Sequence, residues 1–419
     1  MDMNTLREGE EFARAAAAAI ARQSYGKLVA FLASRSHDVA SAEDALSEAF
    51  AAALVDWPKN GCPSNPEGWL LTVARRRLID FSRKKYRDDQ AAARLLVVLN
   101  DLNQATLARE IPDERLGLMF ACAHPSIEEN LRAPLILQAV LGLSAKTIAS
   151  AFLSSPAAMS KRLVRAKEKI RLAGIPFRVP EREELAERLP TVLDAIYASF
   201  GEGWTDANGT DVARRSLTGE AMYLARIVTE MLPNEAEALG LLGLMLHAEA
   251  RRKARRGSSE QYIPLGEQDQ RLWDAGMIVE AEVLLERAGK LKTLGRYQLE
   301  CALQSAHVFR LKTGRDNWKE IVLLYDALFG MTGSPVVAIN RALAISHSDG
   351  FRAGLSALDV LASDSRVSQY QPYWAVRAEL LMRMGEIEDA LTAYELAIGL
   401  ESDPAVRRFL QGRQSAIRE

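Results

Sequence analysis

Residues 141–171 read LGLSAKTIASAFLSSPAAMSKRLVRAKEKIR, and this stretch predicts two helices joined by a tight turn. Gly142 closes an apolar run, and Ser144 is a good N-cap for a short helix. Ser155 is a suitable N-cap for the next helix, and Pro156 suits its first position. A short helix, a tight turn and a basic second helix together form a helix-turn-helix pattern.

The second helix of this pattern has one apolar face and one basic face. Its apolar positions recur at helical spacing and are Met159, Leu163, Ala166 and Ile170. From residue 161 to residue 171, six cations are opposed by Glu168 alone. In a helix-turn-helix, the N-terminal end of such a helix enters the major groove, where small residues allow close approach and free N–H groups favour phosphate. A solvated helix face is the alternative interpretation of the same charges.

The composition of the chain limits the classes of protein to consider. The 419 residues have a net charge of −2, but residues 1–175 hold 24 Lys and Arg against 20 Asp and Glu, whereas the rest is acidic. This asymmetry favours nucleic-acid contact by the front half alone. The three cysteines and five histidines lack metal-site spacing, so no metal and no cofactor are expected. With neither a membrane span nor a signal peptide expected, we predict a cytoplasmic protein.

The periodic segments along the chain have a helical period, which predicts an all-α protein. A first helical block spans 10–87, and a polar stretch at 88–111 links it to a second block at 112–175. A proline-bearing linker follows at 174–183, and a third helical region spans 184–419.

The third region shows a weak internal repeat. Gly314, Gly350 and Gly385 are spaced 36 and 35 residues apart, and each lies between two amphipathic helix patterns. Residues 373–400 are similar to a tetratricopeptide repeat in the positions of Trp374, Gly385, Ala390, Tyr394 and Ala397. We therefore expect a stack of helical hairpins, which generally offers a concave surface for a partner. No pair of carboxylates, nucleophile motif or phosphate loop points to catalysis, so we predict that the chain is not an enzyme.

Two stretches of the first block carry a second nucleic-acid signal, SAEDALSEAF (41–50) and WLLTVARRRLIDFSRKK (69–85). The second stretch predicts a helix with apolar residues on one side and Trp69 among basic residues on the other. An aromatic beside arginines suits melted DNA, because bases stack on the ring while cations follow the backbone. The alternative is a surface helix that the tryptophan anchors.

These two stretches resemble region 2 of bacterial sigma factors of the extracytoplasmic-function (ECF) type. The resemblance lies in Ala42-Glu43-Asp44 with Glu48 and Phe50, and in the W.L..AR...ID..R pattern that begins at Trp69. The helix-turn-helix block then resembles region 4, with a short linker between the two regions. The rear region is similar to the helical, tetratricopeptide-like extension of one ECF subgroup, in FGEGWT (200–205), GLLGLMLHAEARR (240–252) and SPVVAINRALA (334–344).

The resemblance implies a fold and a set of roles. It implies a region 2 bundle, a region 4 helix-turn-helix and a regulatory helical extension, with core RNA polymerase (the β′ clamp helices and the β flap) and promoter DNA as partners. The residues implied to bind core polymerase are Glu43, Asp44 and Glu48. Those implied to bind the −10 element are Trp69, Arg76, Arg77, Arg83 and Lys84. Those implied to read the −35 element are Ser155, Ala157, Ala158, Ser160, Lys161, Arg162 and Arg165.

The predicted function is therefore that of a sigma factor, whose rear region responds to a protein or small-molecule regulator. The alternative is a one-component transcription regulator that joins a helix-turn-helix to a helical sensor. That alternative explains 141–171 and 184–419, but it leaves 41–50 and 69–85 without a role.

Overall fold

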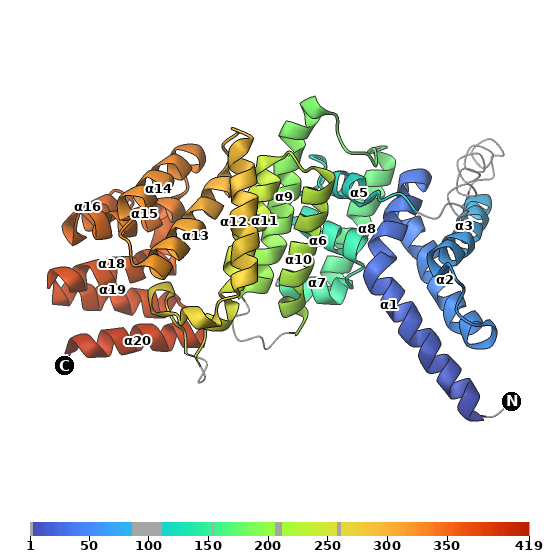
Figure 1. Ribbon diagram of the computed structural model, residues 1–419, viewed down its shortest axis with the longest axis horizontal. Coiled ribbons are helices and arrows are strands. Elements are labelled where there is room, and N and C mark those ends of the chain that lie inside the picture. The colour runs from blue at the N-terminus through green and yellow to red at the C-terminus, as the bar shows by residue number, and fades with distance from the viewer. Residues whose placement is uncertain (1–2, 86–110, 153, 206–211, 258–260, 419) are drawn as a thin grey trace. The chain divides into compact units, whose positions relative to one another are not determined.

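The computed structural model describes residues 3–85, 111–152, 154–205, 212–257 and 261–418 (Figure 1). In these ranges the regular elements are all α-helices or short 3₁₀ helices, so the predicted all-α fold is confirmed. The linker expected at 88–111 lies outside the described residues apart from Ile111. The chain divides into two compact units, Met1–Ile227 and Val228–Glu419.

The first three helices form an antiparallel bundle. They are α1 (Met3–Ser36), α2 (Val39–Asn60) and α3 (Pro66–Lys85). Asp38 begins α2, because its side chain accepts a hydrogen bond from the backbone N–H of Ser41 at 3.1 Å. Each helix turns an apolar face inward, and the fully buried residues include Phe31, Leu46 and Leu70. The bundle therefore has its own core.

Six further helices are described in the first unit. They are α5 (Arg115–Cys122), α6 (Glu129–Leu141), α7 (Ala145–Ala151), α8 (Pro156–Leu172), α9 (Arg182–Thr205) and α10 (Val212–Met231). Helices α5, α7, α8 and α9 contact α6. Helix α1 contacts both α5 and α6, which joins this group to the bundle. The approach is close at Gly26, where an added Cβ would lie 1.7 Å from the carbonyl oxygen of Val140.

The boundary between the two compact units differs from the linker position that the sequence predicts. The segment 174–183 was expected to separate the front domains from the rear region, but α9 packs on α5 and α6. Arg188 of α9 donates a hydrogen bond to the carbonyl oxygen of Phe120 at 3.0 Å, and its guanidinium lies 5.6 Å from the centre of that ring. Tyr223 of α10 contacts Arg115 of α5. The first hairpin of the rear region thus belongs to the first unit.

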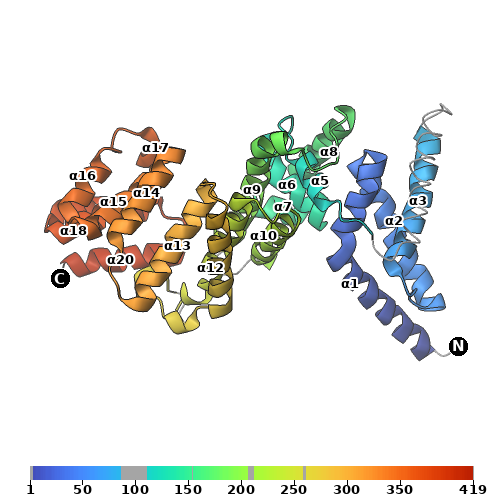
Figure 2. The ribbon, with the colours of Figure 1, turned by 45° about the horizontal axis from the view of Figure 1, so that its top comes forward.

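The second unit is a series of helical hairpins, which Figures 1 and 2 show from two directions. Its α-helices are α11 (Ala236–Ala250), α12 (Ala275–Lys290), α13 (Arg296–Thr313), α14 (Trp318–Thr332), α15 (Pro335–Ser348), α16 (Phe351–Asp359), α17 (Ser365–Ser368), α18 (Gln371–Met384), α19 (Ile387–Leu400) and α20 (Pro404–Arg418). Gly314, Gly350 and Gly385 each join two helices with a positive φ, as predicted from their spacing. In the last hairpin, Ala390 and Tyr394 are buried.

The segment between α11 and α12 folds back onto this unit. It contains the 3₁₀ helices η1 (Arg252–Ala254), η2 (Leu265–Glu267) and η3 (Gln270–Leu272). Arg256 forms an ion pair with Asp403, just before α20, and Arg251 donates a hydrogen bond to Gln304. The basic run at 251–256 therefore contributes to packing, and α20 lies along α19 beside this segment.

Candidate nucleic-acid interface

The turn between α7 and α8 has the local structure that the sequence predicts. Gly142 ends α6 in the left-handed region at φ 70°, and the Ser144 side chain caps α7 by accepting from the N–H of Thr147 at 3.1 Å. The Ser155 side chain accepts from the N–H of Ala158 at 3.2 Å, and Pro156 is the first residue of α8. The N-cap and proline predictions for these helices are confirmed, so a short helix, α7, precedes the longer helix α8.

Helix α8 buries the apolar face that its spacing predicts. Met159, Leu163, Ala166 and Ile170 are all buried. Most of the candidate −35 residues lie on the exposed side, and these are Ser155, Ala157, Ala158, Ser160, Lys161 and Arg165. The first three turns of α8 therefore present small residues and two exposed cations, and groups of this kind can approach a DNA groove.

Arg162, another candidate −35 residue, is less exposed than its neighbours. Its guanidinium donates a hydrogen bond to Oδ1 of Asn130 at 2.9 Å and lies 3.8 Å from Oε2 of Glu128. Both partners flank the start of α6. To reach DNA, Arg162 would have to exchange these partners, whereas Lys161 and Arg165 extend from the exposed side of the helix.

Helix α3 carries the candidate −10 residues, and Trp69 lies at its start. The Trp69 ring is partly exposed and packs edge-on against buried Trp57, with 5.6 Å between ring centres. Arg76 and Arg77 are exposed, and Nε of Arg77 lies 3.0 Å from Oε2 of Glu48. The side chains of the remaining candidates, Arg83 and Lys84, lie outside the described residues. Trp57 therefore holds the Trp69 ring in place beside a basic surface.

The three acidic candidates on α2 have different surroundings. Glu43 is largely buried and forms an ion pair with Lys167 of α8, whose side chain is only 7% exposed. Burial raises the pKa of Glu43, and Lys167 opposes that rise. Glu48 pairs with Arg77, and Asp44 is exposed. Of the three, Asp44 is the most accessible to a partner protein.

An exposed stripe on α2 was not predicted from the sequence. It runs along one helix face and consists of Asp44, Ser47, Ala51, Leu54 and Val55. Leu54 is 44% exposed and Val55 is 63% exposed, although both are large apolar residues. The available signal in the sequence was that these residues follow Ala42-Glu43-Asp44 on the same predicted helix. Which face of α2 stays exposed, however, depends on how α1 and α3 pack against it.

Two further properties concern the described ranges as a whole. Within them, no group of three or more His, Cys, Asp or Glu side chains is placed to hold a metal ion. None of the described helices combines the length and the apolar character that crossing a bilayer requires.

Comparison with known proteins places the chain in a family. The chain is 36% identical over 375 residues to a protein of Rhizobium meliloti (strain 1021) named "Uncharacterized protein R00370", and the alignment covers 88% of each chain. The chain belongs to the same family as that protein. Solved structures yield no significant match.

Two parts of the chain also match family models. Residues 20–88, which hold α2, α3 and much of α1, match sigma-70 region 2. Residues 188–289 match the family described as "Family of unknown function (DUF6596)". A sigma-70 region 2 supports a role as a sigma factor in transcription initiation, and the sigma-70 family consists of non-enzymatic transcription factors. Region 2 generally implies binding to core RNA polymerase and promoter DNA.

Proposed function

We propose that the chain is an ECF-type sigma factor that binds core RNA polymerase through α2 and promoter DNA through α3 and α8. The observation that carries this proposal is the sigma-70 region 2 match on a bundle that exposes both an apolar stripe and a basic helix. RNA polymerase acts in the cytoplasm, so the proposed function requires the protein to act there.

The exposed stripe of α2 is the proposed contact with the β′ clamp helices. Leu54 and Val55 supply adjacent apolar area on the exposed face of α2, and Asp44 adds a negative charge nearer the start of the same face. Apolar contact supplies affinity, while the acidic group favours a basic partner surface and the correct orientation. Glu43 and Glu48 would act indirectly, because both already hold basic side chains of this chain.

The two candidate DNA surfaces would serve different steps. On α3, the Trp69 ring offers a stacking platform for an unpaired base, with Arg76 nearby to follow the phosphates. On α8, Lys161 and Arg165 extend from a helix start that has small residues. These features support melting of the −10 element by α3 and reading of the −35 element by α8.

Binding both elements at once requires the first unit to open. The two elements are centred about 25 base pairs apart, which is roughly 85 Å at the rise of B-DNA. A compact body of 227 residues has a radius of gyration of about 17 Å and is therefore roughly 45 Å across. The contact of α2 with α8 and that of α1 with α6 must then separate on a promoter. We propose that the rear region regulates this step.

The decisive experiment is a pull-down of the full chain with core RNA polymerase, followed by promoter-dependent transcription. Val55→Asp should reduce core binding at least about tenfold, because it places a charge in the centre of the proposed apolar contact. Val279→Asp is the matched control, since Val279 is 64% exposed on α12 and Val55 is 63% exposed. If the chain does not bind core polymerase but binds operator DNA, it is instead a one-component regulator. Equal core binding by both variants would remove the α2 stripe from the interface.

A further inference from the structure

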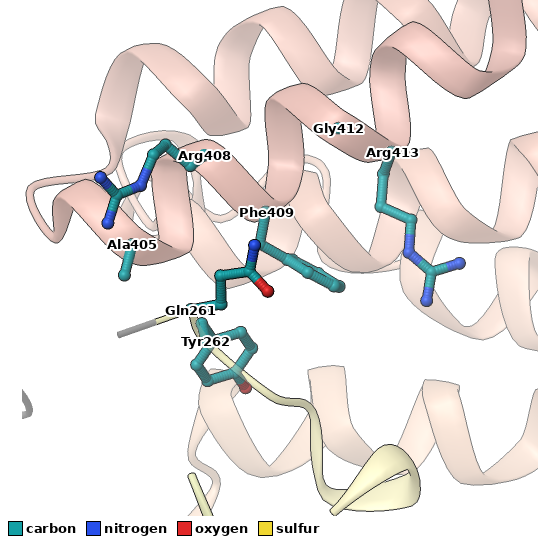
Figure 3. A pocket seen from close by; sticks show the side chains of 7 residues that line it. All are labelled: Gln261, Tyr262, Ala405, Arg408, Phe409, Gly412 and Arg413. Atoms are coloured by element: carbon teal, nitrogen blue, oxygen red, sulfur yellow. The ribbon is translucent and has the colours of Figure 1, made fainter. Parts of the chain in front are cut away.

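Two adjoining cavities lie between α20 and the segment 261–264 of the second unit, with volumes of about 390 and 330 Å³. Both are lined by Tyr262, Phe409 and Arg413, so they share one wall. Figure 3 shows the smaller cavity, with the rings of Tyr262 and Phe409 next to each other in its wall. Their ring centres are 5.5 Å apart in an edge-to-face arrangement.

The larger cavity is mostly apolar and draws on several helices. Its apolar lining consists of Pro264, Leu343, Pro372, Ala375, Val376, Val406 and Leu410, from the 261–264 segment, α15, α18 and α20. The ion pair between Arg256 and Asp403 ties the start of α20 to the segment before residue 261. A cavity of this size with a few polar groups on an apolar wall is typical of small-molecule sites.

The acidic group of the larger cavity already has partners. Glu379 accepts a hydrogen bond from the Tyr394 hydroxyl at 3.2 Å and forms an ion pair with Arg383 at 2.9 Å. Burial raises the pKa of Tyr394, and the neighbouring Glu379 carboxylate adds to that rise. The Tyr394 hydroxyl therefore stays neutral and bound to Glu379, which leaves little reason for a cation to enter.

The basic group has a partner that is easier to exchange. Arg413 lies over the Phe409 ring at 5.3 Å and forms an ion pair with Oε1 of Glu267 at 2.7 Å. The side chains of Arg413 and Glu267 are 36% and 57% exposed, so water screens their attraction. The pair therefore contributes little to the stability of the fold. In Figure 3, Arg408 extends toward the other end of the small cavity, and its side chain is exposed. Guanidinium groups thus stand at both ends of an aromatic wall.

We propose that these two cavities bind one small organic anion, which consists of an apolar ring system with a single acid group. The rings occupy the apolar space beside Tyr262 and Phe409, and the acid group takes the place of Glu267 on Arg413. The acid group forms a charge-assisted hydrogen bond with the Arg413 guanidinium, and the apolar contact of the rings adds to this interaction. The proposal concerns the second unit alone and does not depend on the sigma-factor function.

The test uses the full chain and two fluorescent probes that differ in their charge. 8-Anilinonaphthalene-1-sulfonate has two aromatic ring systems and a sulfonate, whereas N-phenyl-1-naphthylamine has the same rings without the acid group. Arg413→Met keeps an apolar stem and removes the charge. It should weaken binding of the sulfonate about tenfold or more and leave binding of the neutral probe unchanged. Arg407→Met is the matched control, because Arg407 is exposed on the same helix and lines neither cavity.

A second variant keeps the test sharp if Arg413→Met folds poorly. Glu267→Gln removes the competing carboxylate, so it should tighten sulfonate binding by up to about fivefold. Sulfonate binding that is the same in wild type, Arg413→Met and Glu267→Gln would overturn the proposal. Uptake of many sulfonate molecules per chain, with no response to either variant, would also overturn it by showing general adsorption to apolar surface.

Discussion

The side chain of Lys167 faces inward, although this residue belongs to a basic helix. It lies on α8 among exposed cations, yet its ammonium group meets the buried carboxylate of Glu43 on α2. Nearby, Nε of Arg171 on α8 lies 4.0 Å from Oδ2 of Asp38, the residue that caps α2. Lys167 and Arg171 therefore hold α8, the proposed DNA-reading helix, against α2, the proposed polymerase-binding helix.

Lys167→Ala should destabilise the first unit by about 3–5 kcal/mol, because it leaves the buried carboxyl group of Glu43 without its partner. The double variant Glu43→Leu with Lys167→Met should cost much less, since no buried charge remains. Urea unfolding measures both. Lys169→Ala, at an exposed position on α8, should change stability by less than about 0.5 kcal/mol. If Lys167→Ala behaves like Lys169→Ala, the ion pair does not hold the unit closed.

His307 should make the second unit sensitive to acid. Burial, assisted by Arg310, Arg251 and His347, lowers the pKa of His307 to about 4. In the unfolded chain this histidine titrates near its ordinary value of about 6.5. Between these two values the unfolded state binds more protons, so stability is full above about pH 6.5 and falls as the pH drops toward 4.

The loss attributable to His307 should be of order 2 kcal/mol between pH 7 and pH 4.5. Unfolding by urea at a series of pH values measures it. His307→Phe keeps a ring against Trp318, whose centre lies 5.7 Å away, and should flatten this part of the profile. An identical pH profile for wild type and His307→Phe would mean that other groups cause the acid sensitivity.

Two helices that are far apart in sequence come into backbone contact at Gly26 of α1. An added Cβ there would lie 1.7 Å from the carbonyl oxygen of Val140 on α6, a distance that no rotamer can relieve. Two residues after Val140, Gly142 ends α6 with a positive φ and lies against the Tyr25 ring. The bundle of α1, α2 and α3 and the group of helices around α6 are therefore held together by small residues as well as by charge.

Gly26→Ala should push α1 away from α6 and cost about 3 kcal/mol or more in stability of the first unit. Gly219→Ala is the control, because Gly219 lies in α10 with no atom within 4 Å of its added Cβ. That control should stabilise the helix by about 0.5–1 kcal/mol. Thermal unfolding distinguishes the two, and a neutral Gly26→Ala would mean that α1 and α6 do not meet this closely in solution.

At the scale of the whole molecule, the first hairpin after residue 181 belongs with the front of the chain. Helix α9 buries Leu189, Val192 and Ile196, and it covers α5 and α6. The family model that matches 188–289 therefore spans the division between the two compact units. A truncation meant to release the front half must keep α9 and α10.

A chain ending after Met231 should fold and unfold cooperatively, whereas one ending after Ala173 should lose more than about 5 kcal/mol or aggregate. The shorter chain uncovers the apolar faces of α5 and α6, and each large apolar side chain that returns to water costs about 1.5–3 kcal/mol. Circular dichroism during urea unfolding compares the two. Equal stability would show that α9 contributes nothing to the fold of the first unit.

The features that the sequence alone determined are local ones. The caps at Ser144 and Ser155 depend on a side chain and a backbone N–H three residues away, and the hairpin glycines depend on a single φ angle. The buried faces of α8 follow from spacing within one helix. Such signals survive in any tertiary context, so the all-α fold, the caps on either side of the turn before α8 and the hairpins of the rear region could be predicted.

The tertiary structure decided which of these faces meet. Helical spacing shows that Lys167 flanks the buried side of α8, but only the packing of α2 against α8 makes it the partner of Glu43. In the same way, the packing of α2 against α3 sets Trp69 on Trp57, and the packing of α9 on α5 and α6 moved the division of the chain from 174–183 to Ile227. Each of these outcomes depends on contacts between segments far apart in sequence, and the periodicity of a single helix carries no information about its neighbour.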